Sequence, residues 1–193
     1  MRIAVISLLS AAVLMAANVP RPSPAFTIQR VGEAPITIKQ YQGKIVMVAF
    51  IFTTCPHCQQ LTRGISPMAR EYAPKGVQFL ECAFNQNADK LVSEFNRTFL
   101  PGFPVGWADD GAVKSYLRIP VLGNQIFYVP HLVFIDRYGV IQGDYAGESD
   151  FMKNPEVNIR AELEKMLKAP ATPEKKAPEK KTRTTASAGS THK

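Results

Sequence analysis

The stretch IVMVAFIFTTCPHC, residues 45–58, decides the fold. Residues 45–52 form a continuous apolar run of β-favouring residues, which is typical of a strand buried on both faces in the middle of a sheet. Apolar residues then recur at helical spacing from Cys58 to Tyr72, so a helix follows the strand directly. Thr54 is placed to cap that helix, and Pro67 inside the pattern predicts a kink or a break.

The rest of the chain alternates between the two kinds of element. The pattern predicts a strand over residues 77–84, a helix over 89–99, a hairpin of 131–136 and 140–145, and a last helix that opens at Asn154-Pro155. The second strand is expected to lie parallel to the first, whereas the hairpin adds antiparallel strands. The sequence therefore predicts one α/β domain, a central mixed sheet flanked by helices.

The amino terminus differs in composition from the rest. After Met1-Arg2, an almost unbroken apolar run extends from Ile3 to Ala17, which is the pattern of a secretory signal. Its length also approaches that of a bilayer span, so a cleaved leader and a retained inner-membrane anchor both stay open. We predict that residues 1–24, which end in a proline-rich link, are this leader or anchor. Residues 25–168 then form a periplasmic or extracytoplasmic domain.

The carboxyl terminus is basic and lacks core-forming residues. Residues 169–193 contain no aromatic or large aliphatic side chain, which predicts a disordered tail. Residues 168–193 hold seven Lys or Arg against two Glu, and they therefore account for most of the net charge of +7. Because the remainder is close to neutral, the composition points to no nucleic-acid partner. A solvated appendage is the simplest reading of the tail, with weak attraction to an anionic surface as the alternative.

Cysteine usage indicates redox chemistry. The chain has three cysteines, which are too few for a disulfide-stapled scaffold in an exported protein. Cys55 lies at the expected amino end of the helix, where free N–H groups and the helix dipole favour a negative thiolate, so it is the predicted nucleophile. Cys58, one turn on, can attack a mixed disulfide and release the partner. Pro56 and His57 lie between them and are the candidates for redox tuning, because a donor at His57 stabilises the thiolate and raises oxidising power.

Two static readings of the CxxC are weaker. A zinc site needs two further ligands, and only Cys82, His131 and His192 remain, with no second CxxC. A structural disulfide that closes so short a loop restrains the unfolded chain little. We therefore predict no metal and no cofactor, and an enzyme whose partners are protein dithiols or disulfides.

Three segments resemble the thioredoxin-like oxidoreductases of the TlpA and ResA type. They are residues 41–44 (YQGK) before the core strand, residues 53–58 (TTCPHC) after it, and Val129-Pro130 before the hairpin. The resemblance covers about residues 26–167 and implies a thioredoxin-like fold. It also implies that Pro130 is cis and lies against the CxxC, and that the backbone of Val129 binds the substrate chain. A trans proline at the start of a strand is the ordinary alternative.

The direction of electron flow stays open at this point. A TlpA-like body suggests a reductant of periplasmic thiols, such as those of apocytochrome c, whereas the Cys-Pro-His-Cys motif also resembles that of the periplasmic oxidant DsbA. We expect an oxidising or intermediate poise, and a membrane or periplasmic partner that recycles the dithiol. Many thioredoxin-like proteins carry a buried acid six residues before the first cysteine, where this chain has Ala49. Either a water or Glu81 is the candidate substitute.

Other readings stay open as well. Cys82, in the second strand, is expected to be a small buried hydrophobe. His131 follows the predicted cis-proline and either approaches the motif or is a strand residue with a satisfied ring. A thiol peroxidase is a rival function, because peroxiredoxins share this architecture, although Phe52 replaces the threonine that they carry three residues before the reactive cysteine. A non-catalytic module that binds or delivers copper or zinc is the other rival.

Overall fold

The computed structural model describes residues 19–119 and 127–169. The apolar run at 3–17 and all but the first residue of the basic tail at 169–193 lie outside the described residues, so the leader, the anchor and the disordered tail stay predictions. Within the described ranges, no helix has the length and apolar character needed to cross a membrane.

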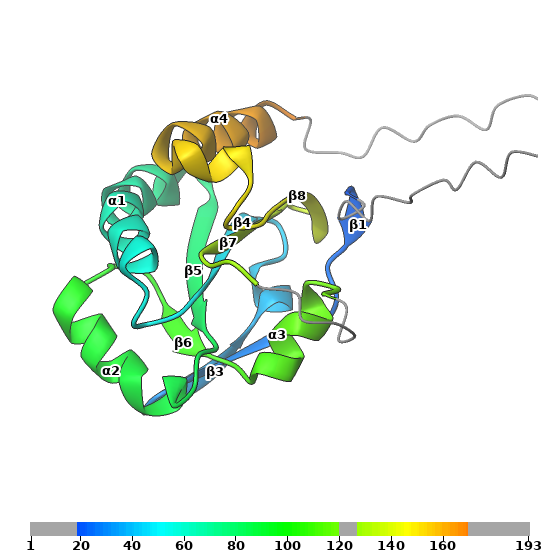
Figure 1. Ribbon diagram of the computed structural model, residues 1–193. Coiled ribbons are helices and arrows are strands. Elements are labelled where there is room, and N and C mark those ends of the chain that lie inside the picture. Colours follow the sequence, from blue (N-terminus) through cyan, green and yellow to red (C-terminus); the bar gives the residue numbers. More distant parts are fainter. Residues whose placement is uncertain (1–18, 120–126, 170–193) are drawn as a thin grey trace, which may run out of the picture.

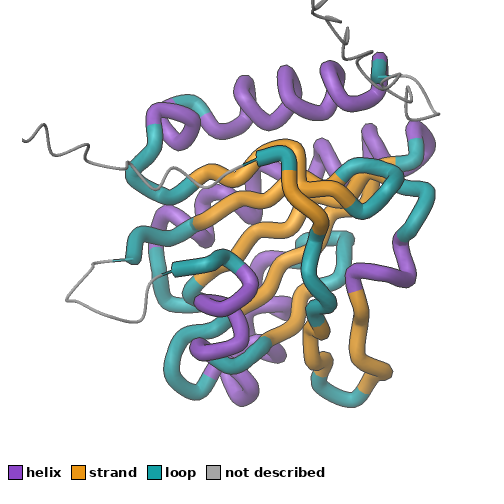
Figure 2. The backbone as a smooth tube through the Cα atoms, turned by 90° about the vertical axis from the view of Figure 1, so that its right-hand side faces the viewer, coloured by secondary structure: helices purple, strands orange, loops and turns teal. Residues whose placement is uncertain are grey.

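The described chain forms one eight-stranded mixed sheet with helices packed against it (Figures 1 and 2). The strands follow the spatial order β1-β8-β7-β4-β5-β6-β2-β3. Their bounds are β1 Arg21–Pro22, β2 Thr27–Arg30, β3 Glu33–Thr37, β4 Ile45–Ile51, β5 Val77–Ala83, β6 Val105–Trp107, β7 His131–Ile135 and β8 Val140–Tyr145. The helices are α1 Pro56–Tyr72, α2 Ala88–Phe99, α3 Asp110–Tyr116 and α4 Pro155–Lys168, with 3-10 turns η1 Ile38–Tyr41, η2 Ala73–Lys75 and η3 Asp150–Lys153. The predicted single α/β domain is confirmed.

Strand β4 lies at the centre of the sheet, as its sequence predicts. All seven of its residues are buried, and it pairs in parallel with β5 on one side and antiparallel with β7 on the other. Its carboxyl end leads into α1, so the CxxC emerges at the middle of one edge of the sheet. This placement puts the motif next to the loops that follow β5 and precede β7.

Two apolar cores cover the two faces of the sheet. One contains the inward sides of α1, α2 and α4, and α1 and α4 lie next to each other on that face (Figure 1). The other contains α3 and the residues that follow β1, including Phe26, whose ring contacts those of Phe50 and Tyr116. Because both faces of the sheet are covered, the sequence of β4 is a continuous apolar run and does not alternate between apolar and polar residues.

The structure differs from the sequence-based expectation in two places. The sequence predicts a domain that begins at residue 25, whereas β1 pairs Arg21 and Pro22 with β8, so the sheet begins earlier. Helix α1 runs through Pro67 without ending, so the break considered there does not occur. Residues on both sides of Pro67, among them Ile65 and Met68, pack into the core and hold the helix to the sheet through this point.

Candidate active site

The two motif cysteines occupy different environments. Cys55 is the N-cap of α1 with Pro56 as the first helical residue, so the expectation that Thr54 caps the helix is wrong. Proline at this position needs no hydrogen bond, and its fixed φ suits the first turn, which allows the helix to begin right after Cys55. Cys55 is partly exposed, whereas Cys58 is fully buried, and both are free thiols. The pair therefore presents one sulfur to solvent and keeps the other in the core.

The buried thiol resists ionisation. Burial is the main cause that raises the pKa of Cys58 far above its ordinary value, and the nearby side chains of Cys55 and Glu81 add to the rise. A hydrogen bond with the backbone of Phe52 opposes these effects without cancelling them. Cys58 thus holds its proton until a base removes it, which suits a resolving thiol rather than an attacking one.

The residue before the hairpin lies against the motif. The Val129-Pro130 peptide bond is cis, as the resemblance implies. The Cys55 Sγ lies 3.9 Å from the carbonyl oxygen of Val129, at the limit for a hydrogen bond from sulfur. Five residues that the sequence singles out, Cys55, Pro56, His57, Val129 and Pro130, therefore come together at this edge of the sheet, with Cys58 beneath them.

Side chains from α1 and from the loop that follows β5 fix the loop that carries Cys55. The Oδ1 atom of Asn85 accepts hydrogen bonds from the backbone N–H of Thr53 at 2.8 Å and from its hydroxyl at 3.2 Å. Gln59, in the first turns of α1, donates its amide to the Thr53 carbonyl at 2.9 Å. Thr53 is buried, so all its backbone polar groups find partners within this loop or its neighbours. These bonds hold the approach to Cys55 in one conformation.

We expect Asn85→Ala to loosen this loop. The substitution leaves the buried N–H and hydroxyl of Thr53 without their acceptor, which should lower the free energy of unfolding by about 1–3 kcal/mol. Asn85→Asp is the matched control, because it keeps an acceptor oxygen, and it should lose much less. Urea denaturation of the three proteins measures the difference. Equal midpoints for Asn85→Ala and the unchanged chain would show that Asn85 does not restrain the loop.

A buried acid lies on the strand beside β4. Glu81 of β5 is paired in register with Ala49, the position at which the family acid is expected, and it is fully buried. Its Oε1 accepts a hydrogen bond from the Thr62 hydroxyl at 2.8 Å, and that hydroxyl also contacts the Cys58 carbonyl oxygen at 3.0 Å. Burial raises the pKa of Glu81 to about 8, and the Thr62 hydrogen bond only partly offsets the rise. A water molecule and Glu81 are the two candidates to replace the buried acid that is absent at Ala49, and Glu81 is the one that the described chain supplies.

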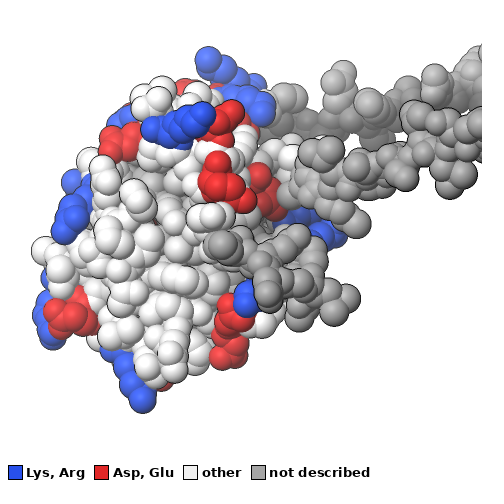
Figure 3. Space-filling model, in the orientation of Figure 1, with Lys and Arg blue, Asp and Glu red and all other residues white. Residues whose placement is uncertain are grey.

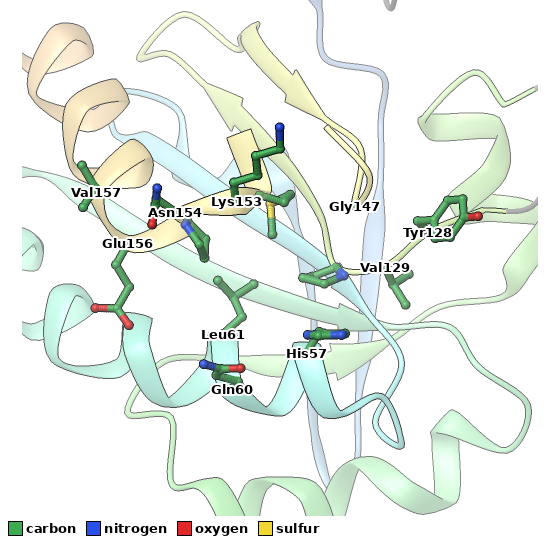
Figure 4. Close-up of a pocket in the computed structure, with 13 residues that line it drawn as sticks. His57, Gln60, Leu61, Tyr128, Val129, Gly147, Lys153, Asn154, Glu156 and Val157 are labelled. Atoms are coloured by element: carbon green, nitrogen blue, oxygen red, sulfur yellow. The ribbon is translucent and has the colours of Figure 1, made fainter. Parts of the chain in front are cut away.

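A cavity of about 650 Å³ opens beside the motif (Figure 4). His57 and Leu61 of α1 line one side, and Val129 and Pro130 line another. The start of α4 and the turn before it complete the wall with apolar Met152, Pro155 and Val157 and polar Lys153, Asn154 and Glu156. An extended chain that reaches Cys55 across Val129 would therefore meet a wall of mixed apolar and polar character. In the view of Figure 3 the charged side chains lie mostly around the edge of the molecule, and its centre is uncharged.

Several of these residues escape a reading of the sequence. A signal for Asn85 was available, because it directly follows a predicted parallel strand, and the carboxyl ends of such strands meet at one edge of the sheet. The contribution of Met152 and Pro155 depends on how α4 docks and leaves no local signal. Cys82 is a buried hydrophobe, as expected. His131 does not approach the motif, since its ring pairs with Asp144 on the neighbouring strand.

This arrangement defines a thioredoxin-like protein: a CxxC at the amino end of the helix after the central strand, with a cis-proline loop against it. The chain belongs to the AhpC/TSA family, whose sequence pattern matches residues 19–143. It is 24% identical over 116 residues to the thiol-disulfide oxidoreductase ResA of Oceanobacillus iheyensis. The match covers 56% of this chain and spans only 58% of the length of that curated relative.

Solved structures share the fold over most of the chain. A putative thioredoxin from Neisseria meningitidis is 26% identical with a TM-score of 0.58, covering 75% of this chain and 88% of that one. A thiol:disulfide interchange protein from Chlorobium tepidum is 22% identical with a TM-score of 0.63, covering 79% and 99%. The predicted thioredoxin-like fold and the resemblance to oxidoreductases of the TlpA and ResA type are confirmed.

Proposed function

We propose that the chain is an exported thiol-disulfide oxidoreductase that exchanges disulfides with protein substrates through Cys55 and Cys58. The observation that carries the proposal is the pairing of a partly exposed cysteine at a helix N-cap with a buried cysteine one turn later, whose pKa is raised by that burial. This pairing divides attack and resolution between two thiols. The relatives named as oxidoreductases and interchange proteins support the same reaction class.

In the reducing direction, the Cys55 thiolate attacks one sulfur of a substrate disulfide. A Cys55–substrate disulfide forms, and the other substrate sulfur leaves as a thiolate. Cys58 then loses its proton and attacks the Cys55 sulfur, which releases the second substrate thiolate and leaves a Cys55–Cys58 disulfide. The substrate gains two electrons and the protein loses two. The reverse sequence oxidises a substrate dithiol.

Glu81 is suited to take the Cys58 proton in the second step. Its carboxyl group is buried behind α1, and its pKa of about 8 lets it exist in both protonation states near neutral pH. In the reverse reaction the same carboxyl group returns a proton to the Cys58 thiolate as it leaves. Glu81 would therefore hold and move one proton in each turn of the cycle.

Val129 and the cavity would bind the substrate chain. The Val129 carbonyl lies beside the Cys55 sulfur, so a strand that pairs with its backbone brings a substrate cysteine to the nucleophile. His57 extends from the first turn of α1 into the same cavity (Figure 4), where it can donate to a sulfur that carries negative charge. The apolar part of the lining can receive apolar side chains and the polar part can bind backbone groups, which favours an extended or partly unfolded protein segment.

The cellular setting is part of the proposal. The apolar run at residues 3–17 supports export to the periplasm or an equivalent compartment, with or without retention as an anchor. Disulfide exchange in such a compartment needs a second redox protein, in the membrane or the periplasm, that restores the dithiol or the disulfide after each turnover.

A redox titration tests the reaction class and sets its direction. We expect the Cys55/Cys58 couple to titrate against glutathione as one two-electron transition, because both thiols enter a single disulfide. A potential near about −270 mV would identify a reductant and one near about −120 mV an oxidant, and we expect a value nearer the oxidising end. Alkylation of free thiols followed by mass spectrometry reports the oxidised fraction at each ratio.

Two variants complete this experiment. Cys82→Ser should titrate like the unchanged chain, because Cys82 is buried away from the exchange. Cys58→Ser should show no two-electron transition and should accumulate a glutathione adduct at Cys55. A chain that stays fully reduced at every glutathione ratio, with no adduct in Cys58→Ser, would exclude the proposed function.

Thiol peroxidase activity is the second candidate, because the match to the AhpC/TSA family is compatible with a peroxidase as well as with an oxidoreductase. It would require a polar group beside Cys55 to orient a peroxide. At the position three residues before Cys55 the chain carries Phe52, whose ring packs on Phe84 at 4.7 Å between centroids. We therefore rank disulfide exchange first, and rapid consumption of hydrogen peroxide by the reduced chain would reverse that order.

A further inference from the structure

Three ionisable side chains are buried together on the side of the sheet opposite α1. The His131 Nε2 atom lies 2.5 Å from Asp144 Oδ1, and the Arg21 Nη2 atom donates to Asp144 Oδ2 at 2.7 Å. Their side chains are 7%, 1% and 4% exposed for His131, Asp144 and Arg21. We call these three residues the buried triad.

The triad joins the β7–β8 hairpin to β1, a strand that is more than a hundred residues away in the sequence. Asp144 of β8 bonds His131 of β7 through one oxygen and Arg21 of β1 through the other. Burial alone would raise the pKa of Asp144, but the hydrogen bonds and charges of His131 and Arg21 outweigh it, and the pKa is lowered. Asp144 is therefore held as a carboxylate that bridges the amino-terminal strand and the start of β7.

The triad is poorly explained as a device for stability alone. The desolvation of buried charges offsets most of their mutual attraction, and apolar residues of similar volume often serve a fold as well. Within the described residues, the Nε and Nη1 atoms of Arg21 and the Nδ1 atom of His131 have no hydrogen-bond partner. What the three side chains do fix is the orientation of the His131 ring.

That ring holds one end of the loop against Cys55. His131 directly follows Pro130, and the ring of Phe127 stacks on the imidazole with centroids 5.4 Å apart and planes 19° apart. The ring contact thus holds the first and last residues of the 127–131 segment together, and Val129 and Pro130 lie between them. On the far side of the loop, the Tyr128 carbonyl accepts a hydrogen bond from the N–H of Gly147 at 3.3 Å.

We infer that Arg21 is a positioning residue for substrate binding: through Asp144 and His131 it sets the place of the Val129 backbone relative to Cys55. The inference rests on the proposed function, because it assigns Val129 to the substrate. It also makes β1, which lies in the proline-rich link after the apolar run at residues 3–17, part of the functional site. Arg21 touches neither the substrate nor the cysteines, so its loss should affect binding of the substrate chain and leave the chemistry of the dithiol unchanged.

Arg21→Met in the full chain tests this inference. Single-turnover reduction of the Cys55–Cys58 disulfide of the oxidised protein is followed at increasing concentrations of a short peptide that contains two cysteine thiols. We expect the half-saturating peptide concentration to rise about tenfold, because the binding backbone is displaced, with the limiting rate and the glutathione-titrated potential unchanged. Arg30→Met is the matched control, since Arg30 pairs with Glu33 at the surface of the β2–β3 hairpin and should leave all three quantities unchanged.

Arg21→Lys separates positioning from a general loss of structure. Only Nη2 of Arg21 reaches Asp144, so one ammonium group can replace it, and the half-saturating concentration should return to within about twofold of the original. A folded Arg21→Met that saturates normally would overturn the inference. The inference would also be overturned if Arg21→Met lowered the limiting rate and the potential as well as weakening peptide binding, or if Arg21→Lys did not restore peptide binding. A full chain that exchanges no disulfide with the peptide would overturn the proposed function first and this inference with it.

Discussion

Cys55→Ser is expected to lower the rate of disulfide exchange by about a thousand-fold or more. The hydroxyl that replaces the thiol is a far weaker nucleophile at neutral pH and cannot form the mixed disulfide through which exchange proceeds. Cys58 cannot take over, because it is fully buried and its pKa is raised far above the ordinary value. Reduction of a protein disulfide substrate, measured with the variant and the unchanged chain at equal concentration, gives the ratio of rates.

Cys58→Ser is the informative partner of this variant. It keeps the exposed nucleophile, so it should attack the substrate at close to the original rate and then stop as a stable Cys55–substrate disulfide. Cys82→Ser controls for the loss of a thiol and should behave like the unchanged chain. Substantial exchange by Cys55→Ser, or a mixed disulfide formed at Cys58 instead, would reverse the assignment of the two roles.

The elements that the sequence predicts well are those with long, regular patterns. Strands β4, β5, β7 and β8 and helices α1, α2 and α4 all appear within one or two residues of their predicted bounds. Strands β1, β2, β3 and β6 and helix α3 were not predicted, because they are short and lack a marked apolar pattern: β3 is as long as β7, but it buries one residue where β7 buries all five. In β6 the sequence offers one signal, Gly106, because a glycine inside a strand often marks the close approach of another backbone. In the structure the backbone of Gln29 lies where a side chain at this position would collide with it.

The candidate site divides along a similar line. The CxxC and Val129-Pro130 are motifs that a local reading can find, and the fold brings them together. The triad could not be predicted, because its members lie on three strands and two of them are separated by more than a hundred residues. An arginine in the proline-rich link after an apolar leader run is expected to be an ordinary solvated charge, and only the pairing of β1 with β8 brings it to Asp144.

Glu81→Gln should remove most of the pH dependence of stability between about pH 5 and pH 8. The folded-state pKa of about 8 lies above the ordinary value of 4.5, so the folded chain holds a proton that the unfolded chain releases across this window. The stability of the unchanged, reduced chain is therefore greatest below the window and falls as the pH rises through it, by up to about 1.4 kcal/mol per pH unit. The pKa values of Cys58 and Cys82 are also raised, but from an ordinary value of 9.0, so neither thiol titrates in the window.

The same substitution tests the proton transfer proposed for resolution. Without a carboxylate to accept the Cys58 proton, release of a preformed Cys55–substrate disulfide at pH 7 should slow by about a hundred-fold. Urea denaturation across the pH range and stopped-flow decay of the mixed disulfide measure the two effects. Glu162→Gln is the matched control, because Glu162 is a largely buried glutamate on α4 that pairs with Lys165 away from the motif. If Glu81→Gln removes the pH dependence of stability but the mixed disulfide still resolves at the original rate, Glu81 is a buried acid and a water molecule takes the Cys58 proton. If the substitution changes neither quantity, the Glu81 carboxyl group is not protonated in the folded chain at neutral pH.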